Sequence, residues 1–226
     1  MNFDNDFDNY VDNYDELLSK DTNFFTKNTD YFSEYKIEII KKRLKILSPQ
    51  KILEPGCGIG RNLKELRKAY KNSIIVGTDI SKQSVAYVNA NINFVECFEE
   101  DFVDHKLNNF DLLLVSGVYH HLDTKNWDSF TDLCAKRLKK GGEMVIFEHN
   151  PFNLITRYIV SRCPYDKGVR LIRKKNLINC IKNHKLSVLN EGYCLFVPQK
   201  FNALKKYEYF FRWLPLGGQY FIHVKK

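Results

Sequence analysis

Between Lys51 and Glu148 the sequence alternates short apolar segments with segments of helical periodicity. Apolar runs such as SIIVGTDI and FDLLLVSG are separated by stretches in which apolar residues recur every three or four positions. This alternation is typical of a parallel sheet with helices on both faces, because each crossover between parallel strands needs a connection of helical length. We therefore expect an α/β fold with a mostly parallel sheet.

The same pattern predicts individual elements. Strands are expected at residues 51–55, 73–80, 92–96, 110–117, 143–149, 187–197 and 220–224. Helices are expected up to residue 47 and at residues 61–70, 81–90, 127–138 and 173–183. Residues 1–47 would form an N-terminal helical lid that stops at Ser48-Pro49, and residues 48–226 the main domain, the two together making a single globular unit. After Pro151 the rhythm breaks for about thirty residues, which we interpret as an insertion after the fifth strand.

Composition excludes several protein classes. With 226 residues, of which 44% are hydrophobic, the chain can bury a core without disulfides or structural metals. No apolar run approaches the roughly 18 residues that a membrane-spanning helix needs. The first residues, MNFDNDFDNY, are acidic where a secretory signal would be basic and apolar, so we expect a cytoplasmic protein. The six cysteines lack zinc spacing and are expected as reduced thiols.

The most informative motif is EPGCGIGR, at residues 54–61, between an apolar strand and a helix. Glycines at such a turn let a ligand approach the backbone, and the following helix begins with unpaired amide groups. The turn therefore predicts a nucleotide-like cofactor. A dinucleotide fingerprint GxGxxG that starts at Gly56 would need glycine at position 61, where this chain has arginine.

The acid followed by alternating glycines resembles the first motif of class I S-adenosylmethionine-dependent methyltransferases, and the resemblance extends over residues 51–148. It implies a Rossmann-like sheet of seven strands, with S-adenosyl-L-methionine as cofactor and S-adenosyl-L-homocysteine as product. Glu54 would lie near the amino acid end of the cofactor, Asp79 would bind the ribose hydroxyls, and Asp101 with Phe102 would hold adenine. The implied cofactor-binding residues are Glu54, Gly56, Cys57, Gly58, Gly60, Asn62, Asp79, Ile80, Asp101, Phe102 and Ser116.

Three histidines are candidates for chemistry. Methyl transfer is an in-line displacement that chiefly needs alignment and exclusion of water, and we expect no metal to be required. A base that removes the acceptor's proton can add roughly 10²- to 10⁴-fold. Ligands of open α/β sheets collect at the carboxyl ends of strands, where this chain places His120 and His121 after the fourth strand and His149 after the fifth. A packing or loop-orienting role for these histidines stays open.

The end of the fifth strand, Glu148-His149-Asn150-Pro151, resembles a subset of these methyltransferases with an EHNP-type ending and an insertion that covers the substrate. This resemblance implies a small polar acceptor, methylated at oxygen: a sugar, a nucleotide sugar or a phosphate-bearing intermediate. The expected substrate-binding residues are Tyr119, Asn150, Arg157, Tyr14 and Lys36. Arg157, Arg162 and Asp166 of the insertion could grip a polar group.

Three rival functions remain. The net charge of +8 is compatible with an RNA or protein methyltransferase. However, the loop SGVY at residues 116–119 does not match the NPPY-like loop of enzymes that methylate exocyclic amines of bases, so we do not expect nucleic acid as partner. A catalytically inactive cofactor-binding subunit is the second rival, and an NAD-dependent oxidoreductase is the third. Oligomeric state stays open.

Overall fold

The computed structural model describes residues 8, 11, 22–99 and 107–226. In this part of the chain, seven strands form one sheet in the order β3-β2-β1-β4-β5-β7-β6. The first five pair in parallel, and β7 runs antiparallel to both β5 and β6. The strands are β1 (Lys51–Pro55), β2 (Ile74–Asp79), β3 (Glu96–Glu99), β4 (Phe110–Ser116), β5 (Leu138–His149), β6 (Ser187–Cys194) and β7 (Gln219–Lys225). The expected seven-stranded, mostly parallel, Rossmann-like sheet is confirmed.

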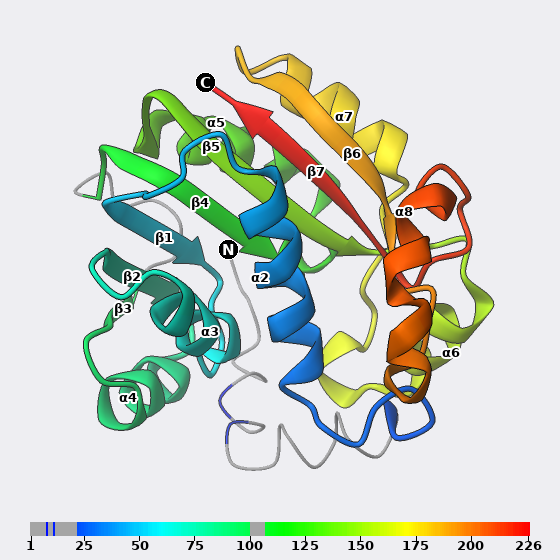
Figure 1. Cartoon of the computed structure of the whole chain (residues 1–226). Coiled ribbons are helices and arrows are strands. Elements are labelled where there is room, and N and C mark those ends of the chain that lie inside the picture. The colour runs from blue at the N-terminus through cyan, green and yellow to red at the C-terminus, as the bar shows by residue number, and fades with distance from the viewer. Residues whose placement is uncertain (1–7, 9–10, 12–21, 100–106) are drawn as a thin grey trace.

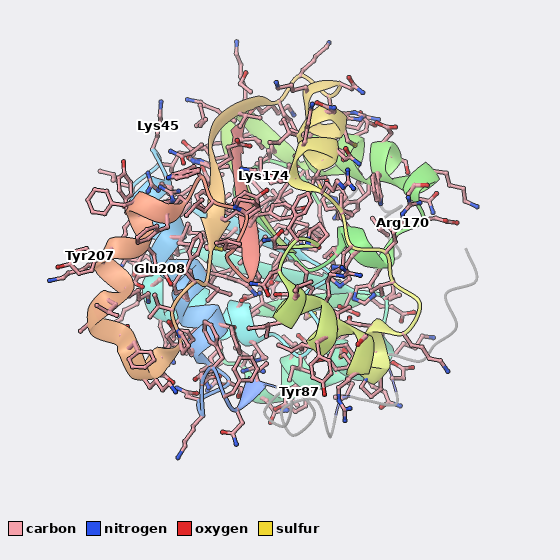
Figure 2. The ribbon with its side chains drawn as sticks, turned by 90° about the vertical axis from the view of Figure 1, so that its right-hand side faces the viewer. Lys45, Tyr87, Arg170, Lys174, Tyr207 and Glu208 are labelled. Carbon is pink, nitrogen blue, oxygen red and sulfur yellow. The ribbon has the colours of Figure 1, made fainter. Side chains whose placement is uncertain are left out.

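Helices cover both faces of the sheet, as Figure 1 shows with α2 in front of the strands and α5 and α7 behind them. The helices that carry the front core are α2 (Tyr31–Arg43), α3 (Arg61–Ala69) and α4 (Lys82–Asn91). The back core is carried by α5 (Trp127–Arg137) and α7 (Lys174–Lys182). The insertion holds α6 (Leu154–Arg162) and the 3₁₀ turn η4 (Pro164–Asp166), and η5 (Gln199–Tyr207) with α8 (Glu208–Phe211) follows β6. In Figure 2, Tyr207 points outward from this last segment, whereas Glu208 lies nearer the body.

The central strands are apolar throughout because each face of the sheet has its own core. Leu112 faces the α2 side and Leu113 faces the α5 side, and both are fully buried. Val145 and Ile146 of β5 divide in the same way. Side chains alternate between faces with a period of two, so a strand covered on both sides must be continuously hydrophobic. Burial of each such side chain contributes about 1.5–3 kcal/mol.

Most predicted boundaries agree with the structure to within a few residues, and Ser81 caps α4 as expected, its hydroxyl accepting from the N–H of Ser84 at 3.0 Å. The third strand was misplaced: it spans Glu96–Glu99 instead of residues 92–96. The N–H of Ile92 bonds back to Val88 as the cap of α4, and Phe94 adopts a left-handed conformation with φ 60°. These residues are therefore used by the helix end and a turn, not by a strand.

The predicted lid helix exists as α2, which packs its buried Tyr31 and Ile40 into the front core. Asp30, just before the helix, lies 3.2 Å from the ammonium of Lys64 and 3.9 Å from the guanidinium of Arg61. These contacts fix the start of α2 against α3, beside the glycine turn. That residues 1–47 act as a lid on the domain of residues 48–226, within one globular unit, stays a prediction.

Candidate active site

A cavity of about 590 Å³ opens where β1, β2, β4 and β5 end. Residues of α2, α6 and the insertion complete its wall. All the residues expected to hold the cofactor line this cavity except Gly60, Asp101 and Phe102. Gly60 instead precedes α3 as its N-cap residue, and the other two lie outside the described residues. The volume lies within the usual range for small-molecule sites, about 300–1,000 Å³.

The glycine turn needs glycine for two physical reasons. Gly56, Gly58 and Gly60 have φ values of 67°, 53° and 77°, in the left-handed region that favours glycine. A Cβ at Gly56 would approach Val118 Cγ2 to 2.7 Å, and one at Gly60 would approach Ile92 Cδ1 to 2.6 Å. At Gly58 a Cβ would meet none of the described atoms within 4 Å, and this residue faces the cavity. Gly58 therefore keeps the cavity open, whereas Gly56 and Gly60 also keep the turn close-packed.

Glu54 presents a buried carboxylate to the cavity. Asn62, the second residue of α3, donates its Nδ2 hydrogen to Glu54 Oε1 at 2.6 Å, and Glu54 Oε2 has no hydrogen-bond partner among the described residues. Burial raises the pKa of Glu54 to about 8. Burial also lowers the pKa of Lys36, from α2, to about 8, and the charge of Glu54 opposes this lowering. The unpaired oxygen and the nearby ammonium suit a ligand that brings both an amine and a carboxylate.

Asp79 ends β2 on the opposite wall of the glycine turn. Its Oδ2 accepts from the N–H of Gly58 at 2.7 Å, and its Oδ1 accepts from the N–H of Ser81 at 2.9 Å. Burial raises the pKa of Asp79, and these backbone hydrogen bonds oppose the rise. The carboxylate thus ties the glycine turn to the end of β2 and leaves its edge at the cavity, beside Ile80.

His120 and Glu148 form a buried pair between the ends of β4 and β5. His120 Nδ1 lies 2.6 Å from Glu148 Oε2, while Glu148 Oε1 accepts from the N–H of Tyr119 at 2.7 Å. Burial alone would lower the pKa of His120, but Glu148 and Asp166 outweigh it and raise the pKa to about 10. The positive His120 in turn holds the pKa of Glu148 below its usual range, against the effect of burial. At neutral pH the pair is charged and rigid.

Two further histidines surround this pair. The His120 ring centroid lies 4.2 Å from that of His121 and 5.1 Å from that of His149. Burial, together with the charge of His120, lowers the pKa of His121 to about 3 and that of His149 to about 4. Both rings are therefore neutral at pH 7, and all three histidines line the cavity. Asp166 Oδ1 lies 3.4 Å from His121 Nε2 and 3.6 Å from His120 Nε2.

Three of the expected substrate-binding side chains lie elsewhere. Tyr119 is fully buried in the back core, with its hydroxyl 2.9 Å from Thr131 Oγ1. Asn150 is fully buried and uses its amide to bond the carbonyls of Pro215 and Gly217. Arg157 is exposed on α6 and does not line the cavity. Tyr119 and Asn150 thus make contacts within the fold, and Arg157 is exposed outside the cavity lining, so a substrate role for these three residues stays a prediction. Tyr14 lies outside the described residues, and Lys36 does line the cavity.

Sequence reasoning missed two features of this cavity. The first is the apolar wall made by Phe25, which precedes α2, Phe32 of α2 and Phe196, which follows β6. The second is the position of Asp166 between two histidines that precede it by 45 and 46 residues. A CPYD turn inside an irregular insertion carries no periodic signal that would have indicated this contact.

Comparisons with known proteins agree with this geometry. Residues 53–144 match a family model described as a methyltransferase domain. A Type II methyltransferase, M.CvrRI of Paramecium bursaria Chlorella virus XZ-6E, is 43% identical over 47 residues, which are 21% of this chain and 12% of that relative's length. The match thus spans only a small part of that relative.

Solved structures resemble nearly the whole chain. A TehB-like SAM-dependent methyltransferase from Corynebacterium glutamicum is 16% identical with a TM-score of 0.64, over 96% of this chain and 97% of that one. A SAM-dependent methyltransferase from Thermotoga maritima is also 16% identical, with a TM-score of 0.70 and 97% of each chain covered. A methyltransferase in complex with the Trm112 activator of Haloferax volcanii is 13% identical, with a TM-score of 0.65 over 97% and 96% of the chains. Identities this low show the fold alone.

The sheet order and the glycine turn are compatible with the methyltransferase domain that residues 53–144 match. The cofactor predicted from the glycine turn is S-adenosyl-L-methionine. The residues present fit this ligand, because the turn is open at Gly58 and the buried Glu54 has an oxygen without a partner among the described residues. Within the described ranges, no helix is long and apolar enough to cross a membrane.

Proposed function

We propose that this protein transfers a methyl group from S-adenosyl-L-methionine to a hydroxyl oxygen of a small polar metabolite: a sugar, a nucleotide sugar or a phosphate-bearing intermediate. The observation that carries this proposal is the layout of the cavity. The glycine turn with Glu54 forms one side, and the histidines at the ends of β4 and β5 form another. A cofactor held on the first side would face acceptor chemistry on the second, at the carboxyl edge where α/β sheets bind ligands.

The cofactor half of the proposal assigns one task to each group. Glu54 accepts from the cofactor's ammonium through its unpaired oxygen, and Lys36 faces the cofactor's carboxylate. Gly56 and Gly58 admit the amino acid end close to the backbone, and Asp79 accepts from the ribose hydroxyls at the end of β2. Cys57, Asn62, Ile80 and Ser116 complete this wall.

In the catalytic half of the proposal, His149 accepts the proton of the acceptor's hydroxyl group. The bound cofactor supplies a methyl group on a cationic sulfur, which keeps the electron pair of the broken C–S bond when the acceptor oxygen forms its bond to the methyl carbon. The hydroxyl proton must leave in this step, and a ring nitrogen of His149, neutral and at the cavity wall, accepts it. His120 is fixed by Glu148 and positions the surrounding rings, while His121 is the alternative base.

A second cavity supports a polar, anionic acceptor. It has about 420 Å³, shares His120 and His121 with the first, and is also lined by Lys167 and Arg170 of the insertion. Figure 2 shows Arg170 beside the segments that follow β4. Two cations next to the proposed reaction centre suit a phosphate or another oxyanion. We propose a cytoplasmic location for such a metabolite enzyme, with no nucleic acid as partner.

One observation favours a second function. The net charge of +8 is compatible with an acceptor that is RNA or protein. The test is incubation of the purified protein with methyl-labelled S-adenosylmethionine and a cell extract separated into small molecules, RNA and protein. We expect label in the small-molecule fraction, and none there with His149→Ala. Label in RNA or protein instead would support the second function, and cofactor binding without transfer to any fraction would indicate an inactive subunit.

A further inference from the structure

Three potential metal ligands converge where the insertion meets the loop after β4. One ring nitrogen each of His120 and His121 and a carboxylate oxygen of Asp166 all lie within 4.8 Å of one another. The distances to Asp166 Oδ1 are 3.6 Å from His120 Nε2 and 3.4 Å from His121 Nε2. His120 and Asp166 are buried, and His121 is partly exposed to the cavities.

These distances fit shared coordination better than direct hydrogen bonding. An N–H···O hydrogen bond is normally 2.7–3.2 Å long between its heavy atoms, and His120 Nε2 has no hydrogen-bond partner among the described residues. Two ligands at about 2.0–2.1 Å from a tetrahedral Zn²⁺ lie about 3.3 Å apart. The observed 3.4 and 3.6 Å are close to this edge length.

Glu148 orients His120 as the outer partner of a metal-binding histidine does. Its Oε2 lies 2.6 Å from His120 Nδ1, which keeps a proton on Nδ1 and leaves Nε2 on the side of Asp166, where a metal ion would replace the proton on Nε2. The N–H of Tyr119 holds the other carboxylate oxygen at 2.7 Å. The ring of His120 is therefore fixed before any ligand arrives.

The two buried carboxylates beside His120 also favour a bound cation. Glu148 and Asp166 bring two buried carboxylates, exposed to only 1% and 7%, into contact with one imidazole ring. Buried carboxylates need compensation by positive charge. A proton on His120 Nε2 supplies one unit, whereas a divalent ion at the same place balances both carboxylates.

We propose that His120, His121 and Asp166 bind a divalent transition-metal ion, with its remaining coordination positions open to the two cavities. Two imidazoles and one carboxylate suit Zn²⁺, Fe²⁺, Co²⁺ or Mn²⁺, and three protein ligands are the number that catalytic zinc sites use. The insertion is tied to the histidines by a backbone hydrogen bond of 3.4 Å from the Arg170 N–H to the His120 carbonyl.

The proposal that a metal ion binds here depends only on the positions of the three ligands. The use of the ion in catalysis rests on the function proposed above: the open positions would orient the acceptor oxygen, and His121 would be a ligand and not a base. Metal binding and methyl transfer are measured separately, so that either proposal can fail alone. Transfer without metal binding overturns the site, and metal binding without transfer overturns the function.

The experiment first removes the other cluster in the described chain that could hold a metal, Asp128 with Cys180 and His184. A His184→Ala protein, treated with chelator and then freed of it, is titrated with Zn²⁺ by calorimetry and with Co²⁺ by visible absorption. We expect one ion per chain, and Co²⁺ bands that indicate four or five ligands. Absence of saturable binding below about 100 μM overturns the proposal, because a preformed site with three ligands binds more tightly than that.

Variants locate the ion. In the His184→Ala background, His121→Ala and Asp166→Asn should each weaken Zn²⁺ binding by at least 100-fold, and Glu148→Gln by about 10- to 100-fold. Because His121 is partly exposed, His121→Ala should disturb folding the least of these variants. Circular dichroism measures whether the other variants are folded. S-adenosylhomocysteine affinity should stay unchanged in His121→Ala. Zn²⁺ binding that survives both His121→Ala and Asp166→Asn overturns the proposal.

Discussion

The substitution Gly58→Ala tests the role of the glycine turn in cofactor binding separately from its role in folding stability. The backbone of Gly58 is left-handed, with φ 53°, so alanine should cost about 1–2 kcal/mol of folding free energy. Its Cβ meets none of the described atoms within 4 Å, and no packing cost is added. At roughly 2–4 °C per kcal/mol for a chain of this size, the melting temperature should fall by about 2–8 °C.

The same methyl group should act strongly on cofactor binding. It projects into space that Gly58 leaves free at the cavity wall, where the cofactor needs close approach to the backbone. Overpacking by one methyl group costs about 1–3 kcal/mol, which corresponds to an increase of about 5- to 150-fold in the Kd of S-adenosylhomocysteine. Calorimetric titration of the folded variant measures this directly.

Two control variants make the result decisive. Gly141→Ala introduces the same strain at φ 79°, with only an ordinary contact to Lys225 at 3.8 Å, far along β5 from the site. It should lose similar stability and keep its affinity. Gly60→Ala adds a clash with Ile92 and Val88, so it should lose about 2–5 kcal/mol. If folded Gly58→Ala bound S-adenosylhomocysteine within twofold of the wild type, the proposed cradle would be refuted.

Three further predictions concern single groups of the site. Burial raises the pKa of Glu54 to about 8 in the free protein, so below this pH its proton must leave when Glu54 pairs with the cofactor's ammonium. The affinity for S-adenosylhomocysteine should therefore fall by up to tenfold per pH unit as the pH falls from 8 toward 6. This pH dependence should vanish in Glu54→Gln. Tyr119→Phe loses the hydroxyl contact to Thr131 and should cost about 0.5–1.5 kcal/mol in urea unfolding, without any change in kcat, which a substrate-binding tyrosine would not allow. His149→Ala should lower kcat by about 10²-fold or more while the Kd of S-adenosylhomocysteine stays within threefold, and unchanged turnover would exclude it as the base.

The cofactor half of the site could be anticipated from the sequence because it is local. Glu54 and Gly58 lie in a single strand, turn and helix, and Asp79 ends the next strand along the chain. Parallel neighbouring strands must present their carboxyl ends at the same edge of the sheet, so spacing alone brings these groups together. The same rule placed His121 near His149, at the ends of β4 and β5.

Side-chain direction was harder to anticipate than position. Tyr119 and His120 are neighbours in one 3₁₀ turn, yet the tyrosine enters the back core and the histidine faces the cavity. In α6, Thr156 and Val160 are buried at helical spacing, which turns Arg157 outward. Such directions depend on which face of a short element packs inward, and a few residues of irregular sequence do not carry that period.

The acceptor half depends on contacts between distant parts of the chain. The loop after β4 meets the end of β5 through the pair of His120 and Glu148, and it meets the insertion through Asp166 and the N–H of Arg170, which both contact His120. The cofactor half shares none of these contacts, since its hydrogen bonds join β1, β2 and α3. The insertion could therefore change in sequence while the cofactor half of the site stays intact. This separation is a physical reason why the glycine turn predicts the cofactor, whereas the proposed acceptor would depend on Asp166, Lys167 and Arg170 of the insertion.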